Sequence, residues 1–134
     1  MTISRTGLFQ LLRKLIAKIC NQTVLNPEYP ESLGGALLVT NHISRLDTVF
    51  LMLSTKREDV IPMVASNYRN APFFGSILKK LVVIWVDRGQ SDLTAMRQVS
   101  EYLKKGWIVG IAPEGKRSRS GKLIEAKPGA VLIA

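Results

Sequence analysis

Residues 36–47 read ALLVTNHISRLD and decide the fold. They begin with a short apolar run, residues 36–40, which lacks polar alternation and is therefore typical of a strand covered on both faces. They end at a helix start, because Ser44 and Asp47 have the spacing of a capping box with Ser44 as the N-cap. The stretch thus predicts a buried strand, a turn and a helix in immediate succession.

Three further apolar runs have the same character, at residues 60–65, 82–86 and 107–112. Pro62 interrupts the first of them and favours an edge position or a late start for that strand, because proline has no N–H to donate to a ladder. Amphipathic segments lie between the runs and predict helices over residues 45–54, 72–81 and 91–105. Ser91 is the expected N-cap of the last helix. Strands that alternate with helices predict a layered α/β domain, with a mostly parallel sheet flanked by helices.

The N-terminal residues form a separate amphipathic segment. Apolar side chains recur at helical spacing along residues 7–20, namely Leu8, Leu11, Leu12, Leu15, Ile16 and Ile19, and basic side chains fall on the other side. Such a helix either lies in an anionic membrane interface or packs on its own domain, and the sequence leaves both open. Residues 21–35 are rich in Pro, Gly and polar residues and indicate a connector. We therefore predict a membrane-proximal helix and connector over residues 1–34 and one compact domain over residues 35–134.

Composition narrows the classes of partner. The 134 residues include 19 Lys and Arg against 10 Asp and Glu, a formal charge of +9, which favours anionic partners. The single cysteine, Cys20, excludes a disulfide framework, and the single histidine, His42, excludes motifs that need two, so we expect no metal site. No 18-residue apolar window predicts a membrane span. Aromatic residues make up 7% and are not interleaved with a basic stripe, so no nucleic-acid partner is expected.

The histidine directly follows the first predicted strand, where α/β sheets place their ligand sites. His42 can accept a proton from a hydroxyl if a carboxylate fixes its tautomer, and Asp47 is the nearest acidic residue. A five-residue offset on one helix separates side chains by about 140°, so the two meet only if His42 lies in the turn before the helix. The same spacing also fits a helix start beside a loop histidine that has no chemical role.

A second polar cluster follows the last predicted strand. The loop over residues 113–122 concentrates four cations, Lys116, Arg117, Arg119 and Lys122, against one carboxylate, Glu114. Cations of this kind suit a phosphate group, although Arg117 stands where a P-loop needs the Ser or Thr that binds Mg²⁺. Arg88, at the end of the 82–86 run, can share a ligand with this loop. A solvated basic loop and an Asp–Arg turn are the plainer interpretations of these features.

Taken in order, three blocks resemble those of the glycerophospholipid acyltransferases, typified by 1-acylglycerol-3-phosphate acyltransferase. The first block, NHxSxxD, is matched by Asn41, His42, Ser44 and Asp47. The second block, an arginine that ends an apolar strand, is matched by Val86-Asp87-Arg88-Gly89. The third block, usually EGTRS, is EGKRS at residues 114–118. The segment Lys127-Pro-Gly-Ala130 also looks like the family, and the resemblance covers roughly residues 35–134.

The resemblance implies a set of roles. His42, paired with Asp47, would act as general base on a glycerol hydroxyl that attacks the thioester of acyl-CoA or acyl-carrier protein, with no further cofactor. The product would be phosphatidate, made from lysophosphatidate by an enzyme held peripherally on the cytoplasmic face of an anionic membrane. Acceptor-binding residues would be Arg88, Glu114, Gly115 and Arg117, and supporting residues would be Asn41, Ser44 and Lys116.

Three departures from the family pattern qualify these expectations. Lys116 replaces the usual threonine, which leaves open another acceptor: glycerol 3-phosphate, another lysophospholipid or an amino-acid lipid. Ser66 stands where the family often has a lysine linked to the oxyanion, so a backbone N–H would have to serve instead. The family's fourth block is missing after residue 134, which predicts a C-terminally truncated domain and leaves its activity open. A non-catalytic basic fragment that binds membranes is therefore the remaining alternative.

Overall fold

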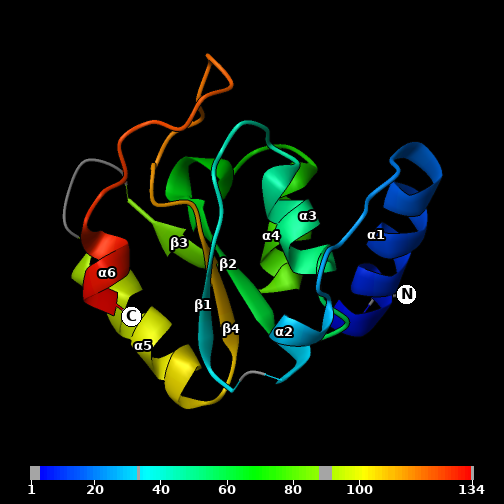
Figure 1. Ribbon diagram of the computed structural model, residues 1–134, viewed down its shortest axis with the longest axis horizontal. Helices are drawn as coiled ribbons and strands as arrows, with labels where there is room; N and C mark the ends of the chain where they lie inside the picture. Colours follow the sequence, from blue (N-terminus) through cyan, green and yellow to red (C-terminus); the bar gives the residue numbers. More distant parts are fainter. Residues whose placement is uncertain (1–3, 33, 88–91, 134) are drawn as a thin grey trace.

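A computed structural model describes residues 4–32, 34–87 and 92–133. The described residues form one four-stranded sheet in the order β1-β4-β2-β3, with every neighbouring pair parallel (Figure 1). Its strands are β1 (Ala36–Val39), β2 (Val60–Ala65), β3 (Ile84–Val86) and β4 (Ile108–Ile111). The predicted α/β class with a parallel sheet is confirmed.

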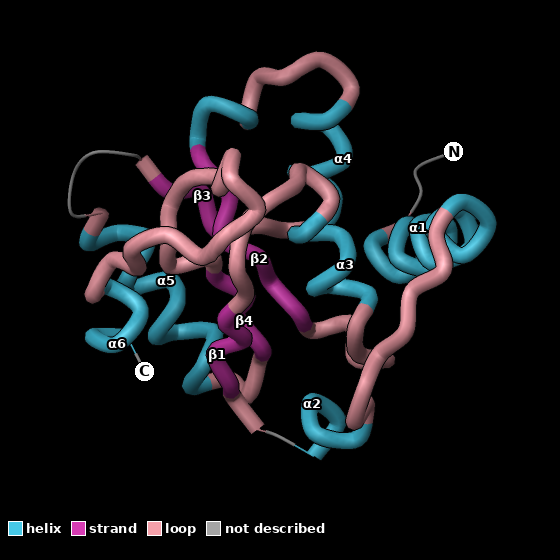
Figure 2. The backbone as a smooth tube through the Cα atoms, turned by 45° about the horizontal axis from the view of Figure 1, so that its top comes forward, coloured by secondary structure: helices cyan, strands magenta, loops and turns pink. Residues whose placement is uncertain are grey.

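Helices cover both faces of this sheet. They are α1 (Arg5–Ile19), α2 (Glu28–Ser32), α3 (Asp47–Leu53), the 3₁₀ turn η1 (Ser66–Tyr68), α4 (Phe74–Leu81), α5 (Leu93–Lys104) and α6 (Gly129–Ile133). Figure 2 shows α3 and α4 on one side of the sheet, with α1 outside them, and α5 and α6 on the other side. In the part of the chain that is described, no helix is long and apolar enough to cross a membrane.

Each face of the sheet carries its own apolar core. Val60 and Ile108 face the core that α1, α3 and α4 cover, whereas their neighbours Ile61 and Val109 face the core under α5. Because successive side chains of a strand point to opposite faces, a sheet covered on both sides needs apolar residues at every position. This requirement explains the non-alternating runs of the sequence.

The structure corrects the expectation for Pro62. β2 is an inner strand, with β4 on one side and β3 on the other, and Pro62 is fully buried within it. In a parallel ladder alternate amides of a strand point to alternate neighbours. Pairing with β3 begins only at Met63, opposite Ile84, so the missing N–H of the proline removes no hydrogen bond from either ladder.

Several element boundaries also differ from those predicted. The N-cap of α5 is Asp92 rather than Ser91, and its carboxylate accepts the N–H of Ala95 at 2.9 Å. β3 begins at Ile84 rather than at residue 82, where the backbone has φ of +60°. The predicted connector contains the short helix α2, and α6 follows the basic loop. Both short helices lack an amphipathic repeat long enough to reveal them from sequence.

Helix α1 packs on its own domain, one of the two alternatives left open by the sequence, but it buries only part of its apolar surface there. Leu8, Phe9 and Ile16 are buried in the core with Met52 and Val60. A second apolar row, spaced four residues apart, stays outside: Leu11 is 42% exposed, Leu15 49% and Ile19 73%. The helix thus packs on its own domain and still presents an apolar surface.

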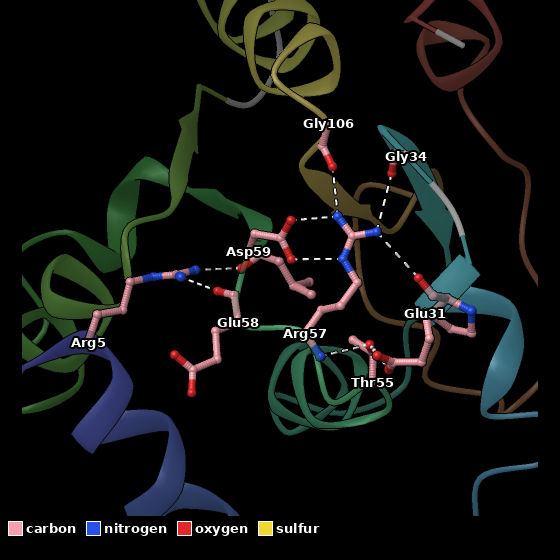
Figure 3. Close-up of polar contacts among 10 residues, drawn as sticks. Arg5, Glu31, Gly34, Thr55, Arg57, Glu58, Asp59 and Gly106 are labelled. Atoms are coloured by element: carbon pink, nitrogen blue, oxygen red, sulfur yellow. Dashed lines mark hydrogen bonds and ion pairs between the residues drawn. The ribbon is translucent and has the colours of Figure 1, made fainter.

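Hydrogen bonds and an ion pair connect the segments at the amino ends of the strands (Figure 3). These ends form the edge of the sheet opposite the first block. The Arg57 guanidinium binds both carboxylate oxygens of Asp59 and the carbonyls of Gly34 and Gly106. Arg5 of α1 donates to the carbonyls of Val60 and Leu81, both at 2.8 Å, and to that of Glu58. These contacts fix α1 and the strand starts, and so leave the carboxyl edge free for a site.

Candidate active site

His42 lies just beyond β1, at the carboxyl edge of the sheet. Its Nδ1 atom is 2.9 Å from Oδ2 of Asp47, the first residue of α3. The histidine therefore lies in the turn before the helix and the aspartate in its first turn, as the spacing requires. Both side chains are partly buried, with exposed fractions of 19% and 22%. The predicted pairing is confirmed in the geometry.

The same carboxylate also closes the turn. Oδ2 of Asp47 accepts the backbone N–H groups of Ile43 and Ser44, each at 2.7 Å. Burial by itself raises the pKa of the Asp47 carboxyl. The N–H of Ser44, the His42 ring and the N–H of Ile43 outweigh that effect, so the pKa lies below its ordinary value. An ionised Asp47 is therefore built into the turn.

Only half of the expected capping box forms. The Asp47 carboxylate reaches back to the N–H of Ser44, but the Ser44 hydroxyl accepts the N–H of Leu46 at 3.1 Å instead of that of Asp47. The N-cap of α3 is Leu46, so the prediction that Ser44 is the N-cap was wrong. The extra residues between Ser44 and the helix form a tight turn, which brings the His42 ring onto the carboxylate.

This arrangement fixes the tautomer of the histidine. A carboxylate that accepts from Nδ1 places the ring proton there and leaves the lone pair of Nε2 free to accept a proton. The negative charge of Asp47 also stabilises the imidazolium that would form. The pair can therefore act as a general base toward a hydroxyl group.

The third block docks onto the first through the backbone. The N–H of Ser118 donates to the carbonyl of His42 at 2.7 Å. A turn closed by the N–H of Gly115 and the carbonyl of Ala112, 3.0 Å apart, carries the loop away from β4, and Gly115 has φ of +64°. This left-handed conformation is one that glycine adopts without steric cost. Residues more than 70 positions apart thus meet at one edge of the sheet.

A cavity of about 750 Å³ opens at this edge. Its polar wall includes His42, Arg45, Gly115, Arg117 and Lys127, and the carboxylates of Asp47, Asp87 and Asp92 also line the cavity. Helices α1, α3 and α4 supply a long apolar wall on one side, with residues such as Ile16, Met52, Ile77 and Leu78. A cavity that combines cationic side chains with a long apolar wall suits an amphiphile with an anionic headgroup.

The other predicted site residues lie in different places. Gly115 and Arg117 line the cavity with His42 and Asp47, whereas Lys116 and Asn41 are exposed and lie outside its wall. Glu114 is 5% exposed, also lies outside the wall, and its Oε2 atom has no hydrogen-bond partner among the described residues. Arg88 falls outside the described residues.

Two cationic residues of the cavity wall have no role in the predictions from sequence. Arg45 occupies a variable position of the first block, and Lys127 belongs to the KPGA segment. The segment resembles the family, but nothing in its spacing indicates that its lysine reaches the cavity. Ser66, by contrast, donates its hydroxyl to Asp87 where β2 and β3 end. The position where the family often has a lysine therefore holds a serine hydroxyl that is bound to a carboxylate.

Comparison with known proteins identifies the family. A family model described as Acyltransferase matches residues 21–134. The chain belongs to this acyltransferase family. The resemblance of the three blocks is thereby confirmed, and the match also includes the connector before β1.

Individual relatives agree with this assignment. The chain is 29% identical over 111 residues to 1-acyl-sn-glycerol-3-phosphate acyltransferase of Bacillus subtilis, covering 83% of this chain and 55% of the relative. It is 32% identical over 107 residues to the chloroplastic enzyme of that name from Arabidopsis thaliana, covering 78% of this chain and 30% of the relative. The chain thus spans about half or less of the length of these curated relatives.

A solved structure shares the fold. The 1-acyl-sn-glycerophosphate acyltransferase PlsC from Thermotoga maritima superposes with a TM-score of 0.68 at 23% identity. The match covers 97% of this chain and 53% of that chain. At this identity the likeness concerns the architecture, which includes the N-terminal helix.

Proposed function

We propose that the protein transfers an acyl group from acyl-CoA or acyl-carrier protein to the free hydroxyl of lysophosphatidate, which gives phosphatidate. The observation that carries this proposal is the His42–Asp47 pair, with 2.9 Å between Nδ1 and Oδ2, in the wall of a cavity that also holds cationic side chains and a long apolar wall. The names of the relatives from Bacillus subtilis and Arabidopsis thaliana support the same acceptor.

The chemistry follows from the tautomer of His42. Nε2 takes the proton of the acceptor hydroxyl while the hydroxyl oxygen attacks the thioester carbonyl, so a C–O bond forms and a tetrahedral oxyanion results. The oxyanion then collapses, the C–S bond breaks, and the thiolate leaves with the proton held by the imidazolium. Asp47 stays ionised throughout, and no acyl-enzyme forms.

Substrate binding divides between the two walls of the cavity. Arg117 and the backbone of Gly115 suit the acceptor phosphate, together with the predicted Arg88, while α1, α3 and α4 offer an apolar surface to the acyl chains. Lys116, which motivated other acceptors, is exposed and lies outside the cavity wall, so it adds no support for them.

We also propose that the protein binds peripherally to an anionic membrane, on the cytoplasmic face that water-soluble donors reach. The exposed row of Leu11, Leu15 and Ile19 supports this location, and Lys14 and Lys18 beside it are exposed cations. An amphipathic helix with these features is typical of interfacial binding.

The experiment is a transfer assay with labelled acyl-CoA and lysophosphatidate, using the full-length protein and its His42→Ala variant. Removing a general base is expected to lower kcat about 10²–10⁴-fold. Gln98→Ala, an exposed change on α5, is the control and should keep the wild-type rate. A His42→Ala protein that is folded and as fast as wild type would refute the assignment of the base.

A further inference from the structure

The segment after the basic loop returns to the third block. The N–H of Lys127 donates to the carbonyl of Pro113 at 2.9 Å, and the hydroxyl of Ser118 donates to the carbonyl of Lys122 at 2.6 Å. Since Ser118 also binds the carbonyl of His42, the returning segment is tied to the first block through one intermediate residue. The backbone of Lys127 is therefore held at the edge that carries the histidine.

The side chain of Lys127 lies over Gly115. A Cβ atom placed on Gly115 would be 3.2 Å from Cε and 3.4 Å from Nζ of Lys127. These are tight contacts, so the ammonium group and the end of its stem occupy the space that a side chain at residue 115 would fill. The glycine thus gives the third block its left-handed turn and also admits the lysine into the cavity wall.

Within the described part of the chain, no ion pair neutralises this ammonium group. The ion pairs found among the described residues are His42–Asp47 and Arg57–Asp59, and Lys127 belongs to neither. Arg117, which lines the same cavity, is likewise in neither pair. The carboxylates of Asp47, Asp87 and Asp92 line the same cavity, but none of them forms an ion pair with Lys127 or Arg117. Two cations that line one cavity repel each other, and an anion bound between them removes that repulsion.

We infer that Lys127 binds the phosphate of the acceptor together with Arg117. The absence of a side chain at Gly115 leaves the space through which the Lys127 ammonium reaches that phosphate. The inference rests on the proposed function and names a residue that it did not include. The attacked hydroxyl and the phosphate of lysophosphatidate stand on neighbouring carbons, so the phosphate must lie near the base, His42. The phosphates of a CoA donor are separated from the thioester by the whole pantetheine arm and lie farther away.

The test compares Lys127→Met, Lys127→Arg and wild type on two acceptors, lysophosphatidate and monoacylglycerol, which lacks the phosphate. Lys127→Met is expected to raise KM for lysophosphatidate about 10-fold, with kcat changed less than about 3-fold, because the lost contact forms in the ground state as well. Lys127→Arg should restore most of the affinity, and the monoacylglycerol KM should not move. Lys122→Met, a neutralised lysine outside the cavity wall, is the matched control and should behave as wild type.

Three outcomes would overturn the inference. They are an equal loss on both acceptors, a rise in KM for the acyl donor instead of the acceptor, and a Lys122→Met protein as impaired as Lys127→Met. Binding of the two acceptors in mixed micelles, followed by tryptophan fluorescence, gives a readout that needs no turnover. If wild type transfers no acyl group, the proposed function fails, whereas equal lysophosphatidate binding by wild type and Lys127→Met removes the role of Lys127 alone.

Discussion

One carboxylate oxygen organises the first block. Oδ2 of Asp47 meets the His42 ring and two backbone N–H groups, so the atom that orients the base also builds the turn that carries it. A structural and a chemical interpretation of the NHxSxxD spacing are therefore not exclusive here. Asp47 both begins the helix and orients the base, His42.

Asp47→Asn separates these two roles. An amide cannot hold the same charge beside His42, so kcat is expected to fall about 10²-fold or more, with KM little changed. Stability should fall by about 1–2 kcal/mol at neutral pH, because hydrogen bonds to an ionised group are lost. The folded-state pKa of Asp47 is lowered, so this difference is fully present above the ordinary carboxyl pKa and disappears as pH falls through the folded pKa.

Initial rates and urea unfolding at several pH values measure both effects of Asp47→Asn. Asp59→Asn, at the opposite edge of the sheet, is the control: it should lose stability and keep its rate. Equal rates for Asp47→Asn and wild type would count against the orienting role.

Gly115→Ala tests the space occupied by Lys127. The added methyl group meets Lys127. The alanine must also adopt φ of +64°, which costs about 1–2 kcal/mol. Gly121→Ala carries the same strain at φ of +71°, but nothing lies within 4 Å of its Cβ position. Thermal unfolding should show a similar loss for both variants, while only Gly115→Ala should raise KM for lysophosphatidate. A KM unchanged in both would mean that the lysine needs no space at residue 115.

At the scale of elements, α1 shows what periodicity leaves undecided. The apolar pattern predicts a helix, and it is satisfied equally by burial in a core or in a membrane. The structure divides the pattern into a buried row around Phe9 and Ile16 and an exposed row of Leu11, Leu15 and Ile19. A helix that packs on the core and also presents an exposed apolar row needs a wide apolar arc, and residues 8–19 supply one.

The double variant Leu11→Ser/Leu15→Ser is expected to weaken binding to vesicles of anionic lipid about 10-fold or more, because each side chain transfers roughly half of its surface to lipid. The melting temperature should change little, since neither leucine belongs to the buried core. Co-sedimentation with vesicles measures the binding. Leu93→Ser removes a leucine that is 65% exposed on α5 and should leave binding intact; an equal effect of both variants would rule out α1 as the docking surface.

The strands were predictable for a physical reason, and their exact limits were not. Runs such as residues 107–112 carry apolar side chains on both faces, and no other element of that length does so. Strand limits and order depend on the partner strand: Pro62 is tolerated inside the sheet only because β3 starts opposite Met63. The five-residue helices α2 and α6 form through tertiary contacts that a local pattern does not contain.

At the scale of the whole molecule, the two edges of the sheet have different tasks. The carboxyl edge gathers the first and third blocks around the cavity, whereas the amino edge is fastened by Arg5 and Arg57. The first block could be predicted because His42 and Asp47 are five residues apart. The approach of Lys127 to Gly115 could not be predicted, because it depends on how the segment over residues 116–126 returns to its start.

Arg57→Met tests this division of tasks. The guanidinium fastens the start of β2 to the segments before β1 and β4, so its loss is expected to lower the free energy of unfolding by about 2 kcal/mol at pH 7, with kcat unchanged. Hydrogen bonds from Arg57 hold the pKa of Asp59 below its ordinary value. The contribution of the pair is therefore complete above that ordinary value and is lost as pH falls through the folded pKa, so wild type and variant should converge in acid.

Urea unfolding across this range measures the convergence, with Arg97→Met, an exposed arginine of α5, as the control. A constant gap at all pH values would show that Arg57 acts through its carbonyl contacts alone, and a parallel fall in kcat would mean that the two edges are not independent.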